Sequence, residues 1–216
     1  MSRLLSVNVS LPKVVTHNGN SFTTAIFKTP VTGSAAVSQL NIAGDKQADL
    51  TVHGGIDKAV YAYSYHNYAY WEKELNRNDF TMGQFGENLT VDNMPDHEVY
   101  IGNRYRIGTT LLEVSQPRVP CFKLNARMDD NRMTKLFFNS GRQGFYLRVL
   151  EEGIITAGDE IIMEKEHPAK ISVQDIFTLY YIDKTNYNSI KKAADLEELT
   201  LSWREGFKEL LSKANR

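Results

Sequence analysis

Short runs of alternating or continuous apolar residues, each ended by glycine, asparagine or aspartate, cover about the first 165 residues of the chain. Runs of this kind predict β-strands separated by tight turns. The predicted strands are 1–10, 21–28, 31–40, 48–52, 59–65, 88–91, 104–107, 110–114 and 160–164. Many short strands with frequent turns favour a mainly β fold, a barrel or a sandwich, and the repeated Gly-Asp and Gly-Asn corners favour a barrel that bends sharply.

A few short helices interrupt the strands. The segment 66–75 carries Tyr68 and Trp71 at helical spacing and predicts an amphipathic helix. The segment 134–139 predicts one short helical turn, and 145–152 suits either a helix or a strand.

The pattern becomes helical after Pro168. Ser172 precedes an apolar stripe that runs to Tyr180 with the i, i+3, i+4, i+7 spacing of a helix face. Asp175 stands three residues after Ser172, so the two predict a capping box at the start of this helix. The segment 187–194 predicts a second, shorter helix.

A third helix is predicted near the C-terminus, where Ser202 and Glu205 have the spacing of another capping box and Trp203 begins an apolar face. Three short helices in roughly 45 residues bury little surface alone, so they should pack on the barrel or on a partner chain. The chain is thus predicted to consist of a β-barrel domain, 1–165, and a three-helix module, 166–216.

The composition limits the classes of partner. The 216 residues are 42 % hydrophobic and 24 % charged, which is ordinary for a globular protein with a substantial core. The formal net charge is −1, so no global field attracts nucleic acid or an anionic membrane. The N-terminus lacks the apolar region of a signal peptide, and no run approaches the roughly 20 apolar residues of a membrane span, so we expect a cytoplasmic protein.

The one cysteine of the chain, Cys121, has a distinctive setting. It excludes an intrachain disulfide, and it follows Pro117 and Pro120 with Arg118 and Lys123 within three residues of it. Nearby cations favour the thiolate, the form that attacks electrophiles or binds metals. One thiolate cannot form a structural zinc site, but it can be a nucleophile, a sulfur carrier or the single protein ligand of a cofactor's metal. The alternative is a buried apolar cysteine.

A second candidate site is the segment His53-Gly54-Gly55-Ile56-Asp57-Lys58. Adjacent glycines let backbone N–H groups approach a ligand and receive an anion, and His53 and Lys58 flank them with further donors. The alternative is a tight turn with solvated polar groups. A nucleophile–base pair of Cys121 and His53 is a further option that sequence spacing cannot test.

Two further groups complete the candidates. Gly86 precedes Glu87 and Asn88, and a kink there would direct both inward, where the Asn88 amide suits the edge of a heterocycle. Six basic residues lie near Cys121 in the sequence, one before it and five after it: Arg118, Lys123, Arg127, Arg132, Arg142 and Arg148. If these cations converge they form a pocket for an anionic ligand, and otherwise they make a solvated basic face.

In these segments the chain resembles the MOSC family (molybdenum cofactor sulfurase C-terminal domain), specifically its YiiM-like bacterial group. The resemblance is carried by Gly44-Asp45-Lys46-Gln47-Ala48-Asp49, His53-Gly54-Gly55-Ile56-Asp57-Lys58-Ala59-Val60, Phe85-Gly86-Glu87-Asn88-Leu89-Thr90, Val114-Ser115-Gln116-Pro117-Arg118-Val119-Pro120-Cys121, Ser140-Gly141-Arg142-Gln143-Gly144-Phe145-Tyr146 and Ala157-Gly158-Asp159. It extends into the C-terminal helices. One departure is Phe145, where tryptophan is expected.

The resemblance implies a closed β-barrel that binds the molybdenum cofactor (molybdopterin). Cys121 falls on the family's cysteine and is the implied metal ligand. Cys121 and His53 are the candidate catalytic residues. The implied cofactor contacts are Gly54, Gly55, Lys58, Asn88, Arg118, Lys123 and Arg142. A soft thiolate suits a metal whose other sulfur ligands come from the cofactor.

The activity implied by the resemblance is reduction of N-hydroxylated compounds, with hydroxylaminopurine-type base analogues as substrates, in a detoxifying oxidoreductase. One cysteine cannot hold an iron–sulfur cluster, so the electrons would come from a separate reductase. Alternatives are a persulfide sulfur carrier that uses Cys121, and a protein that stores the cofactor or binds another phosphorylated ligand without catalysis. The expected oligomeric state is a monomer or a homodimer.

Overall fold

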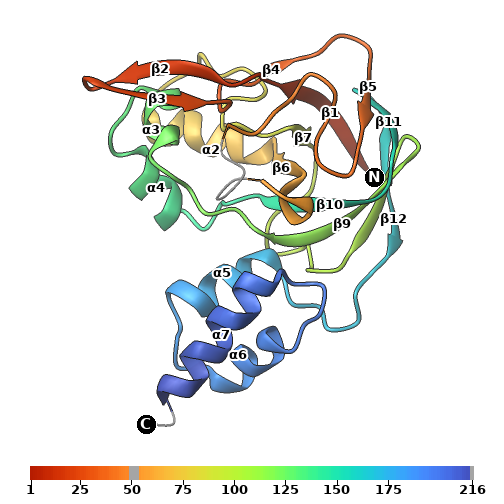
Figure 1. Cartoon of the computed structure of the whole chain (residues 1–216), viewed down its shortest axis with the longest axis vertical. Helices are drawn as coiled ribbons and strands as arrows, with labels where there is room; N and C mark the ends of the chain where they lie inside the picture. Colours follow the sequence, from red (N-terminus) through yellow and green to blue (C-terminus); the bar gives the residue numbers. More distant parts are fainter. Residues whose placement is uncertain (49–53, 215–216) are drawn as a thin grey trace.

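The computed structural model describes residues 1–48 and 54–214. Within these residues, seven strands close into a barrel in the order β12-β8-β9-β10-β6-β7-β1, and β12 pairs again with β1. The strands are β1 (Ser2–Val9), β6 (Val60–Ser64), β7 (Leu89–Val91), β8 (Arg104–Ile107), β9 (Thr110–Pro117), β10 (Phe145–Glu151) and β12 (Glu160–Lys165). β6 and β7 run parallel and the other pairs run antiparallel, so the predicted closed barrel is confirmed (Figure 1).

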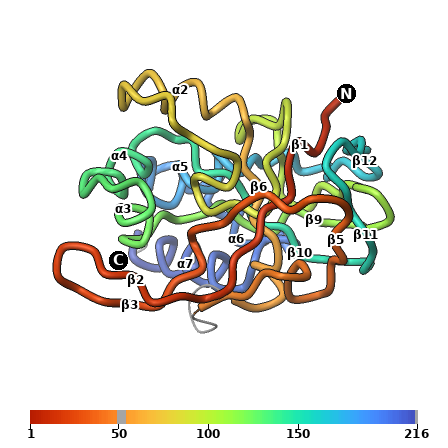
Figure 2. Tube along the Cα trace, turned by 90° about the horizontal axis from the view of Figure 1, so that it is seen from above, coloured from red at the N-terminus to blue at the C-terminus, as the bar shows by residue number. Residues whose placement is uncertain are grey.

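Shorter strands lie outside this ring. β4 (Thr29–Pro30) extends the edge at β1, and β5 (Ser34–Val37) pairs with β11 (Gly153–Thr156). β2 (Lys13–His17) and β3 (Asn20–Thr24) form a hairpin that projects from the body of the molecule (Figure 2).

Four helical segments accompany the barrel: η1 (Ile56–Lys58), α2 (His66–Leu75), α3 (Lys123–Met128) and α4 (Met133–Asn139). Residues of α2, α3 and α4 belong to a second apolar cluster that is rich in aromatic rings. In it Trp71 of α2 stacks on Phe137 of α4, with ring centroids 5.6 Å apart, and donates its indole N–H to the Tyr63 hydroxyl at 2.7 Å. The buried rings fix α2 and α4 against β6.

The C-terminal helices pack on the barrel. They are α5 (Val173–Tyr181), α6 (Tyr187–Ala194) and α7 (Leu201–Ala214), and their apolar faces belong to the same buried cluster as the barrel interior. The capping box of Ser172 and Asp175 is confirmed. The second predicted box is wrong, because α7 begins at Leu201 and Ser202 therefore lies inside its first turn.

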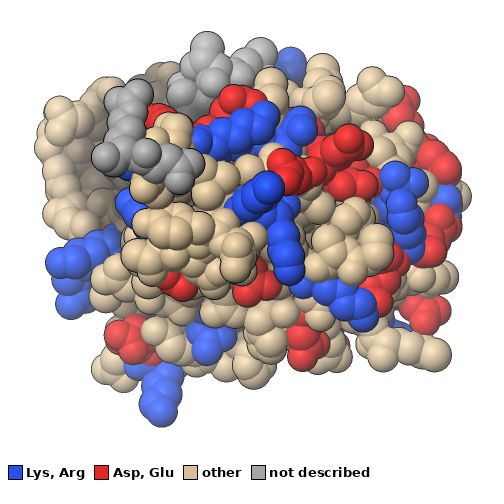
Figure 3. Space-filling view, turned by 90° about the horizontal axis from the view of Figure 1, so that it is seen from below, with Lys and Arg blue, Asp and Glu red and all other residues tan. Residues whose placement is uncertain are grey.

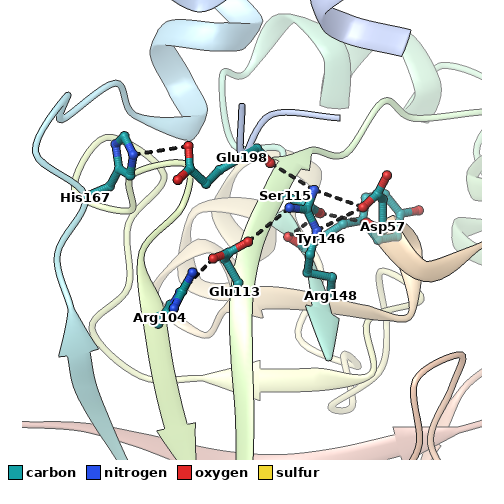
Figure 4. Close-up of polar contacts among 8 residues, drawn as sticks. All are labelled: Asp57, Arg104, Glu113, Ser115, Tyr146, Arg148, His167 and Glu198. Carbon is teal, nitrogen blue, oxygen red and sulfur yellow. Dashed lines mark hydrogen bonds and ion pairs between the residues drawn. The ribbon is translucent and has the colours of Figure 1, made fainter. Parts of the chain in front are cut away.

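A polar network also joins the two parts of the molecule (Figure 4). Arg148 on β10 donates to Asp57 at 2.9 Å, to Glu113 on β9 at 3.0 Å, and to the backbone oxygen of Glu198 at 2.9 Å, in the loop before α7. The Glu198 carboxylate lies 3.2 Å from His167. Arg148 therefore holds η1, the barrel and the helical module in a fixed relation.

On the face that carries the C-terminal helices, basic and acidic side chains are both present among uncharged ones (Figure 3). This agrees with the net charge of −1. None of the helices in the described part of the chain is long and apolar enough to cross a membrane.

The remaining local predictions have mixed outcomes. The ambiguous segment 145–152 is the strand β10, and the predicted strand 21–28 ends early, at Thr24. The helix α3 was not predicted. Of the predicted strand 48–52, residues 49–52 lie outside the described residues.

Candidate active site

Cys121 lines a pocket whose walls come from segments far apart in the sequence. Its described lining residues are Thr24, Ala25, Ile26, Lys28, Asp45, Lys46, Gln47, Ala48, Lys58, Tyr61, Gly86, Asn88, Arg118, Val119, Cys121, Lys123 and Tyr146. Among these, five are cations, and Asp45 is the one acid. This pocket, called the basic pocket below, is therefore suited to an anionic ligand.

Arg118 is the most deeply buried of these cations, at 5 % exposure. Its guanidinium lies 4.7 Å from the Tyr61 ring centre and 5.0 Å from that of Phe137, and it donates to the Tyr61 hydroxyl at 3.1 Å. Burial alone would lower the pKa of Arg118, but neighbouring Tyr61, Tyr146 and Cys121 outweigh it and raise the pKa. In the described part of the chain, Arg118 forms no ion pair with a carboxylate. A buried charge without an opposite charge is costly unless a ligand supplies one.

Cys121 is half-buried, and its backbone is held from two sides. Its carbonyl oxygen accepts from the Leu124 backbone N–H at 2.9 Å and from the Thr134 hydroxyl at 3.1 Å. The next residue, Phe122, packs edge-on against Phe22 of the β2–β3 hairpin at 5.0 Å. Cys121 is thus a fixed pocket residue, which excludes the alternative of an apolar core cysteine.

A buried ion pair, Lys28 with Asp45, forms another wall of the basic pocket. The Lys28 ammonium pairs with the Asp45 carboxylate, which also accepts from the Ser10 backbone N–H at 2.8 Å and from the Asn88 amide at 2.9 Å. Burial lowers the pKa of Lys28, while Asp45 opposes that effect. Lys28 therefore already balances the negative charge of Asp45, and the other cations leave the basic pocket with an excess of positive charge.

Asn88 lines the pocket as predicted, but its amide is committed to the protein. Its oxygen accepts from the Tyr61 backbone N–H at 3.1 Å, and its nitrogen donates to Asp45 and to the Asn8 carbonyl oxygen at 3.2 Å. Gly86 nearby has a φ of +82°, and a Cβ there would lie 2.6 Å from Ile26. The predicted kink at Gly86 therefore exists, and it gives Asn88 a structural function in shaping the wall.

The other predicted residues divide between the basic pocket and the rest of the molecule. Lys58 and Lys123 line the pocket, and burial lowers the pKa of Lys58. Gly54 and Gly55 precede η1, and neither is among the described lining residues of the basic pocket. His53 lies outside the described residues.

The prediction that Arg142 joins this pocket is wrong. Arg142 lines a separate polar pocket with Asn67 and Asp96, where its guanidinium donates to the Asn67 amide oxygen at 2.9 Å and lies 4.3 Å from the Tyr70 ring centre. Gly144 separates it from the basic pocket by turning the chain into β10. Gly144 has a φ of +68°, and a Cβ there would lie 2.6 Å from the Ala62 carbonyl oxygen.

The rest of the basic set does not converge on Cys121 either. Arg132 pairs with Asp130 at 2.7 Å on the surface, and Arg148 is committed to its acidic partners. Arg127 donates to the backbone oxygens of Gln84 and Lys28 and contacts the Phe27 ring at 5.4 Å. Of the six cations grouped by sequence, Arg118 and Lys123 line the basic pocket.

Two pocket residues, Tyr61 and Tyr146, were missed at the level of sequence. They are on neighbouring strands, β6 and β10, with ring centroids 5.4 Å apart, and burial raises the pKa of each phenol. The alternation of Tyr61 with apolar neighbours placed it in a strand, but only the pairing of β6 with β10 brings it to Cys121. Lys28 and Asp45 were missed as a pair because they are 17 residues apart in the chain.

The pocket can therefore hold a negatively charged group beside a soft sulfur ligand. In the described part of the chain, no group of three His, Cys, Asp or Glu side chains could hold a metal ion. A metal at Cys121 would need its other ligands from outside these residues, as a cofactor with its own sulfur donors would provide.

Two family models match the chain. The MOSC domain matches residues 49–162, and the YiiM-like, 3-alpha helix domain matches residues 171–214. The first covers the barrel from the segment before η1 to β12, with the basic pocket's Cys121, and the second covers the C-terminal helices.

Curated relatives and solved structures agree with these matches. An uncharacterized protein YflK of Bacillus subtilis is 36 % identical over 94 % of this chain and 92 % of its own length, and Protein YiiM of Escherichia coli is 34 % identical over 83 % and 80 %. A protein named Reductase from Gibberella moniliformis is 36 % identical over 82 % of this chain but 32 % of its own length. The crystal structure of YiiM from Geobacillus stearothermophilus superposes with a TM-score of 0.83 at 35 % identity, over 98 % of this chain and all of that one (100 %).

Proposed function

The chain belongs to the MOSC domain family and carries the YiiM-like three-helix domain, and from this premise we propose that it is a molybdenum-cofactor-dependent reductase of N-hydroxylated compounds. The relative named Reductase supports an oxidoreductase. The observation that carries the proposal is Arg118, a buried cation without a carboxylate partner in the described part of the chain, in a basic pocket that also contains Cys121.

The residues of the basic pocket fit the cofactor. Its phosphate would bring a negative charge to the Arg118 guanidinium in this pocket, where Lys123 also lies, and Cys121 would be the protein's ligand to its metal. Arg118 is held in place by the Tyr61 and Phe137 rings, so it would contact the ligand without losing side-chain freedom on binding. His53 stays in the proposal as a catalytic candidate from the sequence alone, because it lies outside the described residues.

When bound, the cofactor supplies two-electron redox chemistry, and the protein positions it and the substrate. The overall reaction is R–NHOH + 2 e⁻ + 2 H⁺ → R–NH₂ + H₂O, with the electrons from a separate reductase. Burial lowers the pKa of Lys58, which makes its ammonium a better proton donor than an exposed lysine. Lys58 is therefore our candidate for the side chain that passes a proton to the leaving oxygen.

The test uses protein produced in cells that make the cofactor. We expect bound molybdenum, a pterin fluorophore after oxidation, and conversion of 6-hydroxylaminopurine to adenine with a reduced dye as electron donor. Cys121→Ala should abolish the conversion, whereas Ser212→Ala, at an exposed position of α7, should not change it. Full activity of Cys121→Ala would refute the ligand assignment. Labile sulfur on Cys121 without molybdenum would instead support a sulfur carrier, and bound cofactor without turnover would support a storage protein.

A further inference from the structure

A second pocket adjoins Cys121 on the side of the C-terminal helices. Its described lining residues are Lys58, Gln116, Val119, Pro120, Cys121, Tyr146, Tyr180, Tyr181, Ser202 and Trp203. Four of them, Lys58, Val119, Cys121 and Tyr146, also line the basic pocket. Cys121 therefore lies where the two pockets meet, and the second one, called the aromatic pocket below, is completed by α5 and α7.

The aromatic wall is rigid. Trp203 is 7 % exposed and meets Tyr180 edge-to-face at 5.0 Å and Tyr181 edge-to-face at 6.0 Å. Tyr180 can lie against α7 because the position opposite it is Gly206, where a Cβ would be 2.6 Å from the tyrosine ring. Rings held in this way can bind another ring without a large entropic cost.

The two pockets differ in charge. Whereas the basic pocket has five cations among its described lining residues, the aromatic pocket has one, Lys58, which the two share. Its polar groups are the Gln116 amide, 4 % exposed, and the hydroxyls of Ser202 and the tyrosines. Aromatic faces with a few hydrogen-bonding groups suit an uncharged planar heteroaromatic ring.

We infer that the aromatic pocket is the substrate site, and that the C-terminal helices give the enzyme its preference for ring-bearing over small aliphatic N-hydroxylated compounds. The inference rests on the proposed function. A ring bound against Trp203 and a cofactor bound at Arg118 would reach Cys121 from two adjoining pockets, so substrate and cofactor need not compete for the same space. The three-helix module is thus part of the active site.

A binding experiment tests the inference without catalysis. The chain has two tryptophans, Trp71 and Trp203, so Trp71→Phe leaves Trp203 as the only one. Titration of this variant with 6-hydroxylaminopurine should quench its fluorescence to saturation, and N-hydroxyurea at the same concentrations should not. If Trp71→Phe does not fold, the wild-type protein replaces it, with Trp203→Tyr as the reference that lacks the signal. Absence of saturable quenching overturns the inference.

Kinetics provide the second test. Stacking of a base on an aromatic side chain contributes about 1–3 kcal/mol, so Trp203→Leu should raise KM for 6-hydroxylaminopurine at least about fivefold. Its kcat/KM for N-hydroxyurea should fall far less than its kcat/KM for 6-hydroxylaminopurine, and its molybdenum content should stay at the wild-type level. Tyr187→Leu, which removes an exposed aromatic residue of α6 outside the pocket, is the matched control. Equal losses of kcat/KM for both substrates in Trp203→Leu would overturn the inference. If the protein shows saturable quenching but reduces neither compound, the proposed function is refuted and the inferred binding site is not.

Discussion

Arg118, at the end of β9, and Arg148, on the neighbouring strand β10, have opposite surroundings. Arg118 directly follows β9 and meets aromatic rings and a phenol hydroxyl, with no carboxylate partner in the described part of the chain. Arg148 on β10 is fully engaged by Asp57, Glu113 and the Glu198 backbone oxygen. A cation that already has acidic partners stabilises the fold, whereas one without them is available for an anionic ligand.

The largest expected effect is on cofactor binding by Arg118→Gln. A charge-assisted hydrogen bond with a phosphate would be lost together with the charge, at about 1.5–3 kcal/mol, so we expect a loss of roughly tenfold to a hundredfold in affinity. Wild type and variant, carrying different tags, should be produced in the same cells so that they compete for one cofactor pool. The ratio of molybdenum per folded protein then measures the effect.

The matched control is Arg148→Gln, which should keep the wild-type molybdenum content in the fraction that folds. Equal loss of molybdenum in both variants would contradict the comparison, because it would mean that pairing with carboxylates does not separate the two arginines.

Arg148→Gln should instead reduce stability. The Glu113 carboxylate is 4 % exposed and would keep Arg104 at 2.7 Å as its other partner. Removing one partner of a buried pair costs about 3–5 kcal/mol, and the remaining arginine reduces that loss, so we expect the free energy of unfolding to fall by about 2 kcal/mol. Chemical denaturation of both proteins measures the difference.

The control here is Arg106→Gln, whose partners Glu151 and Glu164 are exposed. It should change the denaturation midpoint far less than Arg148→Gln. A loss as large as that of Arg148→Gln would show that burial of the acidic partner does not decide the effect.

The sequence carried enough information for the elements whose signals are local. The apolar spacing in 66–75 and 187–194 predicted α2 and α6, and Ser172 with Asp175 predicted the start of α5. It could not indicate α3, which has six residues and little room for a repeating pattern. Barrel closure depends on β1 pairing with β12, from the other end of the β region, and no local pattern reports such a pairing.

The candidate site was predictable where the signal was adjacent in sequence. Arg118 and Lys123 flank Cys121 within three residues, and both line its pocket. Arg148 seemed equivalent by position, but its partners Asp57 and Glu113 are 91 and 35 residues away. Charge counted along the chain cannot distinguish a paired cation from an unpaired one, because pairing is set by the strand register.

A third buried charged group, Asp96, allows the effect of a missing opposite charge to be measured through the pH dependence of stability. It forms no ion pair in the described part of the chain, and its carboxylate accepts from the backbone N–H groups of Gln143 at 2.6 Å and Gly144 at 2.9 Å. The Gly144 carbonyl oxygen in turn accepts from the Arg118 backbone N–H at 3.1 Å. Burial raises the pKa of Asp96 from 3.8 to about 6.

Between these two values the folded protein binds a proton that the unfolded chain has released, so this group makes the protein more stable as pH falls through the window and less stable as pH rises through 6. Lowering the pH from 8 to 5 should therefore add roughly 1.5 kcal/mol to the free energy of unfolding in the wild type relative to Asp96→Asn, which keeps an amide oxygen as acceptor. Denaturation of both proteins at the two pH values isolates the contribution of Asp96, because the other groups titrate equally in each protein. A difference of the opposite sign would mean that Asp96 is stabilised as a carboxylate, and that a buried charge here needs no opposite charge.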